Sequence, residues 1–589
     1  MNVLITSLYR RLYKINSFWF ILGLCGFNLL FMHINILQIC HLEAETNFST
    51  WADNFFSISF DVCIVYTICY LLSWRNFKIA TCLCFIVTWL WSFSNIVYSR
   101  FFYHYLSASA IEQGGVLTEK LIFKCIIDSL QVSDLYYSLV AVIFILAIKK
   151  MRPICTRTLV QKSLIIIISS LLIDISAHAA YCIFNPQYRY ISYFTHRLYL
   201  QHLASSRGWS QQNLVHFVRG EIRTIGEEVI KNIQGTIKLS EKQITIIKSA
   251  SNKAQNSCKG NNSINCSPTN IIFIIVESYM SFTSDLIVNG KEVTPFLNSL
   301  KRQATTYYNG KMCENVTIGE SSDGQFIYMT GILPLQSDVT VSRVRRNTLP
   351  GLPKVLGRES RMIIPTTTAV WNQDEMCRQY GFQHLYTRDD YRKNIGDDLN
   401  DKQVFELAIQ KDKSSELPFF SVILTMSMHG PYTDLKDPSF QMSDSSLSKD
   451  LICYLNACHY TDHQIELYFN HLNKTGLINN SLIIITADHR VHKADFGKVS
   501  NHIPLYIVNA NGLPMNIWQG GCNQLDVYTT LLDLLGCKSN WFGLGCSLIS
   551  PNYKDVRSTQ TWNISEWIIM SDYFSKQLLF TTNEKENNN

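Results

Sequence analysis

The sequence predicts a bundle of five membrane-spanning helices followed by an α/β domain built on a largely parallel sheet. Three observations predict this fold. Five long apolar stretches lie within residues 1–185 of the 589. From residue 270 onward, short apolar runs alternate with segments of helical spacing, as is typical of parallel sheets. Two of those runs end in acids, at Glu277 and at Asp488.

The predicted spans have the length and composition of transmembrane helices. They are Phe18–Ile39, Phe56–Trp74, Phe77–Tyr98, Leu135–Ile148 and Leu164–Phe184, and the fourth is the shortest. The first has a long apolar stretch with no small-residue cleavage site after it, so we interpret it as an anchor rather than a signal peptide.

Basic residues in the connecting loops predict the orientation of the spans. Arg10, Arg11 and Lys14 precede the first span, and a further basic cluster separates the fourth from the fifth, whereas residues 41–54 contain no Lys or Arg. The positive-inside rule therefore places the N-terminus in the cytoplasm. Five spans would leave everything after about Asn185 outside the cytoplasm, whereas four spans would reverse that placement.

The charge and the cysteine content of the chain indicate which ligands and cross-links to expect. The net charge of +6 lies largely in the loops beside the spans, and no focused basic patch indicates nucleic-acid binding. Nine of the 18 cysteines precede residue 185 and nine follow it, and the absence of a CxxC pair argues against a structural zinc ribbon. In an oxidising compartment, Cys258/Cys266 and Cys453/Cys458 are close enough in sequence to be candidate disulfides.

The remainder of the chain divides into three predicted parts. Residues 186–269 form a helical connector and a polar loop, residues 270–575 form the α/β domain, and residues 576–589 form a polar, disordered tail. The strands expected in the α/β domain are Ile271–Val276, Met362–Pro365, Phe419–Thr425, Leu482–Thr486 and Pro504–Val508.

Candidate catalytic residues follow from the strand ends. Glu277 and the pair Asp488-His489 each come directly after a buried apolar run, so they are expected at the edge of the sheet where open α/β folds bind ligands. Ser321 and Ser322 precede an apolar helical segment, where a hydroxyl lies beside backbone N–H groups that favour a phosphate. Taken alone, this serine pair is better interpreted as an ordinary helix cap.

Taken together, these residues resemble the alkaline phosphatase superfamily, and within it the lipoteichoic acid synthase branch. The resemblance covers about residues 270–550 and implies a sulfatase-like α/β domain. It implies that Glu277, Ser321, Asp488 and His489 hold one divalent metal ion, Mn²⁺ or Zn²⁺, and that Ser321 is the nucleophile. The adjacent hydroxyl of Ser322 leaves that last assignment ambiguous by one residue.

The resemblance also implies substrate contacts. His429, in the segment Thr425–Tyr432, corresponds to a residue that contacts the substrate phosphate, and Trp371 and Gln373 correspond to residues that hold the polar head of the substrate. His502, at the start of the last predicted strand, is either a substrate-binding residue or a plain hydrogen-bonded histidine. Three features differ from the branch, which has Thr in place of Ser321 and Arg in place of Gln373. It also has a substrate-binding His shortly before the Trp, which has no counterpart among residues 363–370.

The activity implied by the resemblance is transfer of a phosphoglycerol or phosphoethanolamine group from a phospholipid donor to a lipid or glycan acceptor of the cell envelope. It implies a phospho-seryl intermediate and a multi-pass protein of the bacterial inner membrane, with its catalytic domain outside the cytoplasm. A phosphodiesterase, a sulfuric ester hydrolase and an inactive membrane scaffold are the alternatives. No Cys or Ser in the outer domain lies in the Cys/Ser-x-Pro/Ala-x-Arg context that sulfatases require, which ranks the sulfuric ester hydrolase low.

Overall fold

The structure is a computed structural model that divides into two compact units, Met1–Ile233 and Gln234–Asn589. It describes residues 17–40, 48–102, 129–149, 210–258, 270–391, 398–413, 418–430, 446–491 and 499–576, apart from residues 234, 337 and 515–516. Shorter described pieces include 105–107, 164–165, 167–169, Tyr432 and Phe496. The predicted tail lies almost entirely outside these residues.

Long apolar helices make up most of the described part of the first unit. Its elements are α2 (Ser17–Ile39), α3 (Phe48–Leu72), α4 (Phe77–Phe102), η3 (Val132–Asp134), α7 (Leu135–Ile148), α10 (Ser210–Arg219) and α11 (Glu221–Ile233). Within the described residues, α2, α3 and α4 are long and apolar enough to cross a membrane, and α7 belongs to a shorter apolar helical stretch. The predicted fifth span, Leu164–Phe184, falls mostly outside the described residues, so the predicted count of five is not confirmed.

A buried carboxylate attaches α11 to α3. Asp61 accepts hydrogen bonds from the backbone N–H groups of Glu221, at 2.8 Å, and Ile222, at 3.3 Å. These are first-turn N–H groups of α11, which have no partner within their own helix and favour a negative charge. Gly220 permits the approach, because a Cβ atom there would lie 2.6 Å from Asp61 Oδ2.

An eight-stranded sheet forms the centre of the second unit. Its strands are β1 (Asn270–Val276), β4 (Thr306–Cys313), β5 (Glu359–Ile363), β6 (His384–Tyr386), β7 (Phe419–Leu424), β8 (Ser481–Ala487), β9 (Ile503–Asn509) and β10 (Cys522–Asn523). They lie in the order β10-β4-β9-β8-β1-β7-β5-β6, and β2 (Ile287–Val288) pairs with β3 (Lys291–Glu292) in a separate hairpin. Strands β8, β1, β7, β5 and β6 run parallel, whereas β9 is antiparallel to both β8 and β4. The prediction of a largely parallel sheet is confirmed, and each of the five predicted strands overlaps an observed one.

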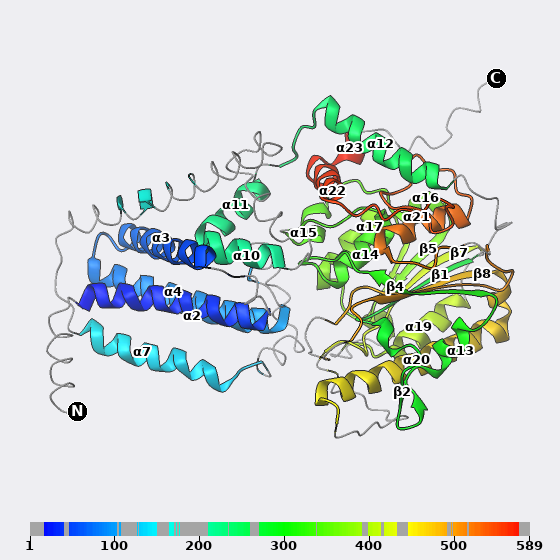
Figure 1. The fold of residues 1–589 in the computed structure, drawn as a ribbon, viewed down its shortest axis with the longest axis horizontal. Helices are drawn as coiled ribbons and strands as arrows, with labels where there is room; N and C mark the ends of the chain where they lie inside the picture. Colours follow the sequence, from blue (N-terminus) through cyan, green and yellow to red (C-terminus); the bar gives the residue numbers. More distant parts are fainter. Residues whose placement is uncertain are drawn as a thin grey trace. The chain divides into compact units, whose positions relative to one another are not determined.

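Helices cover both faces of this sheet (Figure 1). These helices include α13 (Pro295–Lys301), α19 (Asp401–Asp412) and α20 (Lys449–Thr475) on one face, and α14 (Ser321–Thr330), α17 (Gln373–Tyr380) and α21 (Gln524–Leu534) on the other. The remaining helices are α12 (Glu241–Ser257), α15 (Thr340–Val344), α16 (Leu352–Leu356), α18 (Arg388–Tyr391), α22 (Thr559–Ser571) and α23 (Tyr573–Lys576), with η6 (Ser281–Thr283), η7 (Val370–Asn372) and η8 (Leu477–Asn480). Because helices bury both faces, β1, β7 and β8 are buried along their whole length, which explains their continuous apolar runs.

One proposed disulfide does not form in the structure. Cys453 and Cys458 both lie on α20 and are free. They are five positions apart on the helix, so their side chains point in different directions. The other proposed pair includes Cys266, which lies outside the described residues.

Candidate active site

The carboxyl ends of three neighbouring parallel strands bring the predicted acids together. Val276 of β1 is paired with Ala487 of β8, so the residues that follow them, Glu277 and Asp488, leave the sheet side by side. On the other flank of β1, strand β7 ends at the same level, and Thr425 Oγ1 accepts a hydrogen bond from the Glu277 N–H at 3.0 Å. The register of the sheet therefore builds one edge from segments more than 200 residues apart in sequence.

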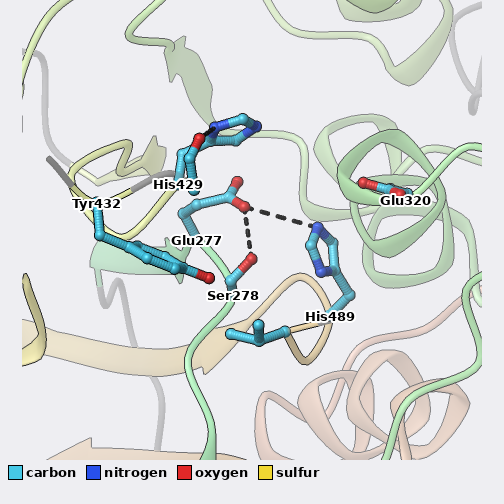
Figure 2. A pocket seen from close by; sticks show the side chains of 8 residues that line it. Glu277, Ser278, Glu320, His429, Tyr432 and His489 are labelled. Atoms are coloured by element: carbon cyan, nitrogen blue, oxygen red, sulfur yellow. Dashed lines mark hydrogen bonds and ion pairs between the residues drawn. The ribbon is translucent and has the colours of Figure 1, made fainter. Parts of the chain in front are cut away.

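Four predicted side chains converge at this edge. Ser321 Oγ lies 3.3 Å from Glu277 Oε2 and 3.2 Å from His489 Nε2. The same His489 nitrogen is 3.7 Å from Glu277 Oε1 and 3.6 Å from Asp488 Oδ2. The candidate ligand atoms of Glu277, Asp488 and His489 all lie within 4.8 Å of one another. Figure 2 shows the Glu277 carboxylate between Ser278 and the imidazole of His489.

A hydrogen-bonded loop sets the position of Ser321. The buried Asp323 carboxylate accepts hydrogen bonds from the N–H groups of Thr317, at 2.9 Å, and Gly319, at 3.0 Å. Between this loop and the first residue of α14, Glu320 adopts φ 41° and ψ −115°, an unusual conformation for a residue other than glycine. Strained backbone of this kind is concentrated at functional sites, where the surrounding structure enforces it.

The adjacent hydroxyl faces away from the acids. Ser322 Oγ donates to the carbonyl oxygen of Gly319 at 2.7 Å, and the residue is 1% exposed. Of the two serines that the sequence left open, Ser321 is the one whose hydroxyl contacts Glu277 and His489.

The N-terminus of α14 offers fewer free donors than the sequence predicts. The N–H groups of Ser322, Asp323 and Gly324 already donate to the carbonyl oxygens of Gly319 and Glu320. What remains available to an anion is the positive end of the helix dipole, whose effect is confined to the first turn.

The electrostatics of this cluster favour a cation. Burial, together with the charge of Glu277, raises the pKa of Asp488 to about 7. Burial alone would lower the pKa of His489, but Asp488 and Glu277 raise it to about 9. The two buried carboxylates repel each other and hold a proton on the histidine. A divalent cation would be stabilised between them, because it offsets this negative charge.

The residues present fit a divalent metal ion. His489 Nδ1 donates to the carbonyl oxygen of Arg490 at 2.7 Å, which directs the lone pair of Nε2 toward the carboxylates once the ring is neutral. Two carboxylates, one imidazole and one hydroxyl form a mixed oxygen and nitrogen set that suits Mn²⁺ or Zn²⁺.

An open pocket adjoins this cluster. Its described lining consists of Glu277, Ser278, Glu320, His429, Gly430, Tyr432, His489 and Val491. His429 and Tyr432 lie on one side of Glu277 and His489 lies on the other (Figure 2). His429 Nδ1 donates to the Gly430 carbonyl oxygen at 2.7 Å, which leaves Nε2 as the other polar atom of the ring. The predicted phosphate-contacting histidine is thus brought to the pocket.

The other predicted substrate-binding residues lie outside this pocket lining. Trp371 has φ 54° within η7, and the next residue but one, Gln373, begins α17. Gln373 Nε2 donates to Gln325 Oε1 at 2.9 Å, so it contacts α14 one turn beyond Ser321. His502 lies at the start of β9, with Nδ1 2.7 Å from Ser500 Oγ.

Five residues of the described pocket lining were not predicted as site residues, namely Ser278, Glu320, Gly430, Tyr432 and Val491. Ser278, which directly follows Glu277, has φ 51° and donates from Oγ to Glu277 Oε1 at 2.7 Å. Tyr432 has φ 64° and directs its ring into the pocket. Their proximity in sequence to Glu277 and His429 was the available signal, but a positive φ is a feature that sequence does not report.

The chain is similar to known proteins of one family of enzymes. A family model described as Sulfatase matches residues 269–537. The chain is 26% identical over 509 residues to lipoteichoic acid synthase 2 of Bacillus subtilis, a match that covers 79% of this chain and 73% of that protein. It is 30% identical over 327 residues to the lipoteichoic acid synthase of Staphylococcus aureus, which covers 49% of this chain. The chain spans about half the length of the Staphylococcus relatives it matches, at 48%.

A membrane protein of known structure is also similar. It is the lipooligosaccharide phosphoethanolamine transferase A of Neisseria meningitidis, with a TM-score of 0.49 and 13% identity over 90% of this chain and 97% of that one. Residues 269–537 thus match the Sulfatase family model, and the chain is similar in sequence to lipoteichoic acid synthases.

Proposed function

We propose that this chain is a membrane-bound, metal-dependent transferase of phosphoglycerol or phosphoethanolamine groups. It takes the group from a phospholipid and passes it to a lipid or glycan acceptor of the cell envelope, through a phosphoester of Ser321. The observation that carries the proposal is the contact of Ser321 Oγ with both Glu277 and His489 at the ends of adjacent strands. The relatives named as lipoteichoic acid synthases support the reaction class.

In the proposed first step, Ser321 Oγ attacks the donor phosphorus and the bond from phosphorus to the diacylglycerol oxygen breaks. The hydroxyl proton leaves Ser321, and the diacylglycerol oxygen takes up a proton as it departs. Glu277, Asp488 and His489, with Ser321, would hold a divalent ion, which supplies Lewis acidity that lowers the pKa of the serine hydroxyl and offsets phosphate charge. His429, from the turn after β7, donates a hydrogen bond to a phosphate oxygen.

In the second step, an acceptor hydroxyl attacks the same phosphorus and releases Ser321. Hydrolysis would use the same intermediate, with water in place of the acceptor, so a phosphodiesterase is the nearest alternative. The apolar helices of the first unit favour transfer, because they hold the chain in the membrane that contains the donor. We propose a bacterial inner membrane location with the α/β domain outside the cytoplasm, which follows from the loop charges together with the predicted count of five spans.

Mass spectrometry of the purified full-length chain tests this proposal. The protein is incubated with Mn²⁺ and vesicles of phosphatidylglycerol or phosphatidylethanolamine, and peptides containing Ser321 are examined for an added glycerol phosphate or ethanolamine phosphate. We expect an adduct in wild type and in Ser322→Ala, and none in Ser321→Ala. An adduct that persists in Ser321→Ala, or no adduct from either lipid, would refute the assignment.

A further inference from the structure

A fully buried amide connects the segments that form the metal-binding edge. Gln524 is the first residue of α21 and is 0% exposed. Its Oε1 accepts a hydrogen bond from the N–H of Asn315 at 2.6 Å, in the segment that leads to the nucleophile. Its Nε2 donates to the carbonyl oxygen of Asp488 at 2.6 Å and to the hydroxyl of Tyr328 at 3.1 Å. Both ends of this amide are therefore satisfied by parts of the chain that surround the candidate site.

Tyr328 adds a second contact to the same strand end. Its hydroxyl donates to the carbonyl oxygen of Ala487 at 2.7 Å, and Tyr328 itself lies on α14, the helix that begins at Ser321. Consecutive carbonyl groups of Ala487 and Asp488 are thus fixed by Tyr328 and Gln524. Because a carbonyl direction fixes the peptide plane, these bonds determine how the side chains of Asp488 and His489 leave the strand.

The geometry points to Gln524 as a positioning residue for the metal ligands Asp488 and His489, acting through the Asp488 backbone. This inference rests on the proposed function, because it takes Asp488 and His489 as metal ligands. Groups that orient metal ligands through hydrogen bonds typically change metal affinity by 10- to 100-fold when they are mutated. Neither Gln524 nor Tyr328 lines the described pocket, so neither acts by touching the substrate.

The substitution Gln524→Glu removes the Nε2 donor that contacts the Asp488 carbonyl oxygen and the Tyr328 hydroxyl. It preserves the shape of the side chain and the acceptor for Asn315, but it places an oxygen where the Nε2 donor faces the Asp488 carbonyl. Tyr328→Phe is a second variant, which removes the hydroxyl that donates to Ala487 and accepts from Gln524 but leaves the Gln524 contact to Asp488 in place. Thr530→Val is the matched control, since Thr530 is buried on the same helix and its hydroxyl donates to Asp526 O at 2.6 Å, away from the metal-binding edge.

The test measures Mn²⁺ affinity of metal-free full-length protein in detergent by calorimetric titration, with melting temperature recorded in parallel. We expect 10- to 100-fold weaker binding in Gln524→Glu, a smaller loss in Tyr328→Phe, and unchanged affinity in Thr530→Val at a comparable loss of melting temperature. Transfer activity of Gln524→Glu should recover as Mn²⁺ is raised.

Wild-type affinity in Gln524→Glu would overturn the inference, as would an equal loss of affinity in Thr530→Val. If wild type binds Mn²⁺ and forms the Ser321 adduct while Gln524→Glu does both equally well, only the positioning role fails. Absence of Mn²⁺ binding in wild type would overturn the proposed function and this inference with it.

Discussion

Replacing Gly324 by alanine should separate the nucleophile helix from the metal-binding strand end. Gly324 lies one turn into α14, and the backbone of Asp488 packs directly against it. A Cβ atom at this position would lie 2.5 Å from the Asp488 carbonyl oxygen and 2.9 Å from its Cα. Both neighbours are backbone atoms at the end of a buried strand, so rotation of a side chain cannot relieve the clash.

The size of the effect follows from this distance. Real Cβ contacts essentially never fall below 3.0 Å, so α14 and Asp488 must separate by at least about 0.5 Å. Overpacking of this kind typically costs about 1–3 kcal/mol of stability. Because a displacement of about 1 Å in a reacting group can cost about 100-fold in rate, we expect a loss of at least about tenfold in transfer.

The assay compares the rate of Ser321 adduct formation and the Mn²⁺ affinity in Gly324→Ala and wild type. Gly521→Ala is the control, because a Cβ atom there meets no atom within 4 Å. The control should keep wild-type rate, affinity and melting temperature. A Gly324→Ala protein within twofold of wild type on all three measurements would show that the close approach of α14 and Asp488 is not needed.

Three further predictions concern buried charges. Asp401→Ala should reduce transfer by about tenfold in a lipid-based assay, because Asp401 accepts hydrogen bonds from the N–H groups of Met426 and Ser427 in the turn that presents His429. The control Gly521→Ala should leave the transfer rate unchanged. Burial raises the pKa of Asp462 to about 7. Between pH 7 and 3.8 the folded protein therefore binds more protons at this carboxyl group than the unfolded protein does. Its free energy of unfolding should rise as the pH falls through that window. Thermal melts of Asp462→Asn should show a weaker rise, and an identical pH dependence would contradict the reasoning. Arg361→Met should cost about 3–5 kcal/mol in denaturant unfolding, because it leaves the buried Asp412 without its ion-pair partner, and a loss below about 1 kcal/mol would refute this.

Strand positions were predictable because each central strand is a continuous apolar run. In a parallel sheet covered on both faces, every residue of a strand is buried, so Asn270–Val276 and Ser481–Ala487 stand out in the sequence. β4 was missed because it contains Gly310 and Lys311 and alternates between buried and partly exposed positions. Its place in the sheet depends on antiparallel pairing with β9, which local sequence does not encode.

The candidate metal ligands were predictable for a similar reason. Acids that directly follow buried strands must lie at the carboxyl edge of a parallel sheet, so Glu277 and Asp488 could be grouped before their distances were known. The donors that fix their backbone were not predictable. Gln524 is a polar residue without a periodic pattern, and its role appears only when β10 pairs with β4 and brings it beside Asp488.

By itself, the sequence determined the apolar helices, the parallel strands and the residue types available at the strand ends, because these follow from hydrophobic pattern and chain direction. Only the tertiary structure decided which of two adjacent hydroxyls meets the acids. Ser321 and Ser322 are chemically identical neighbours, and they differ because α14 rotates about 100° per residue and is fixed by the contact of Gly324 with Asp488. That rotation depends on packing between segments far apart in the chain, which no local pattern records.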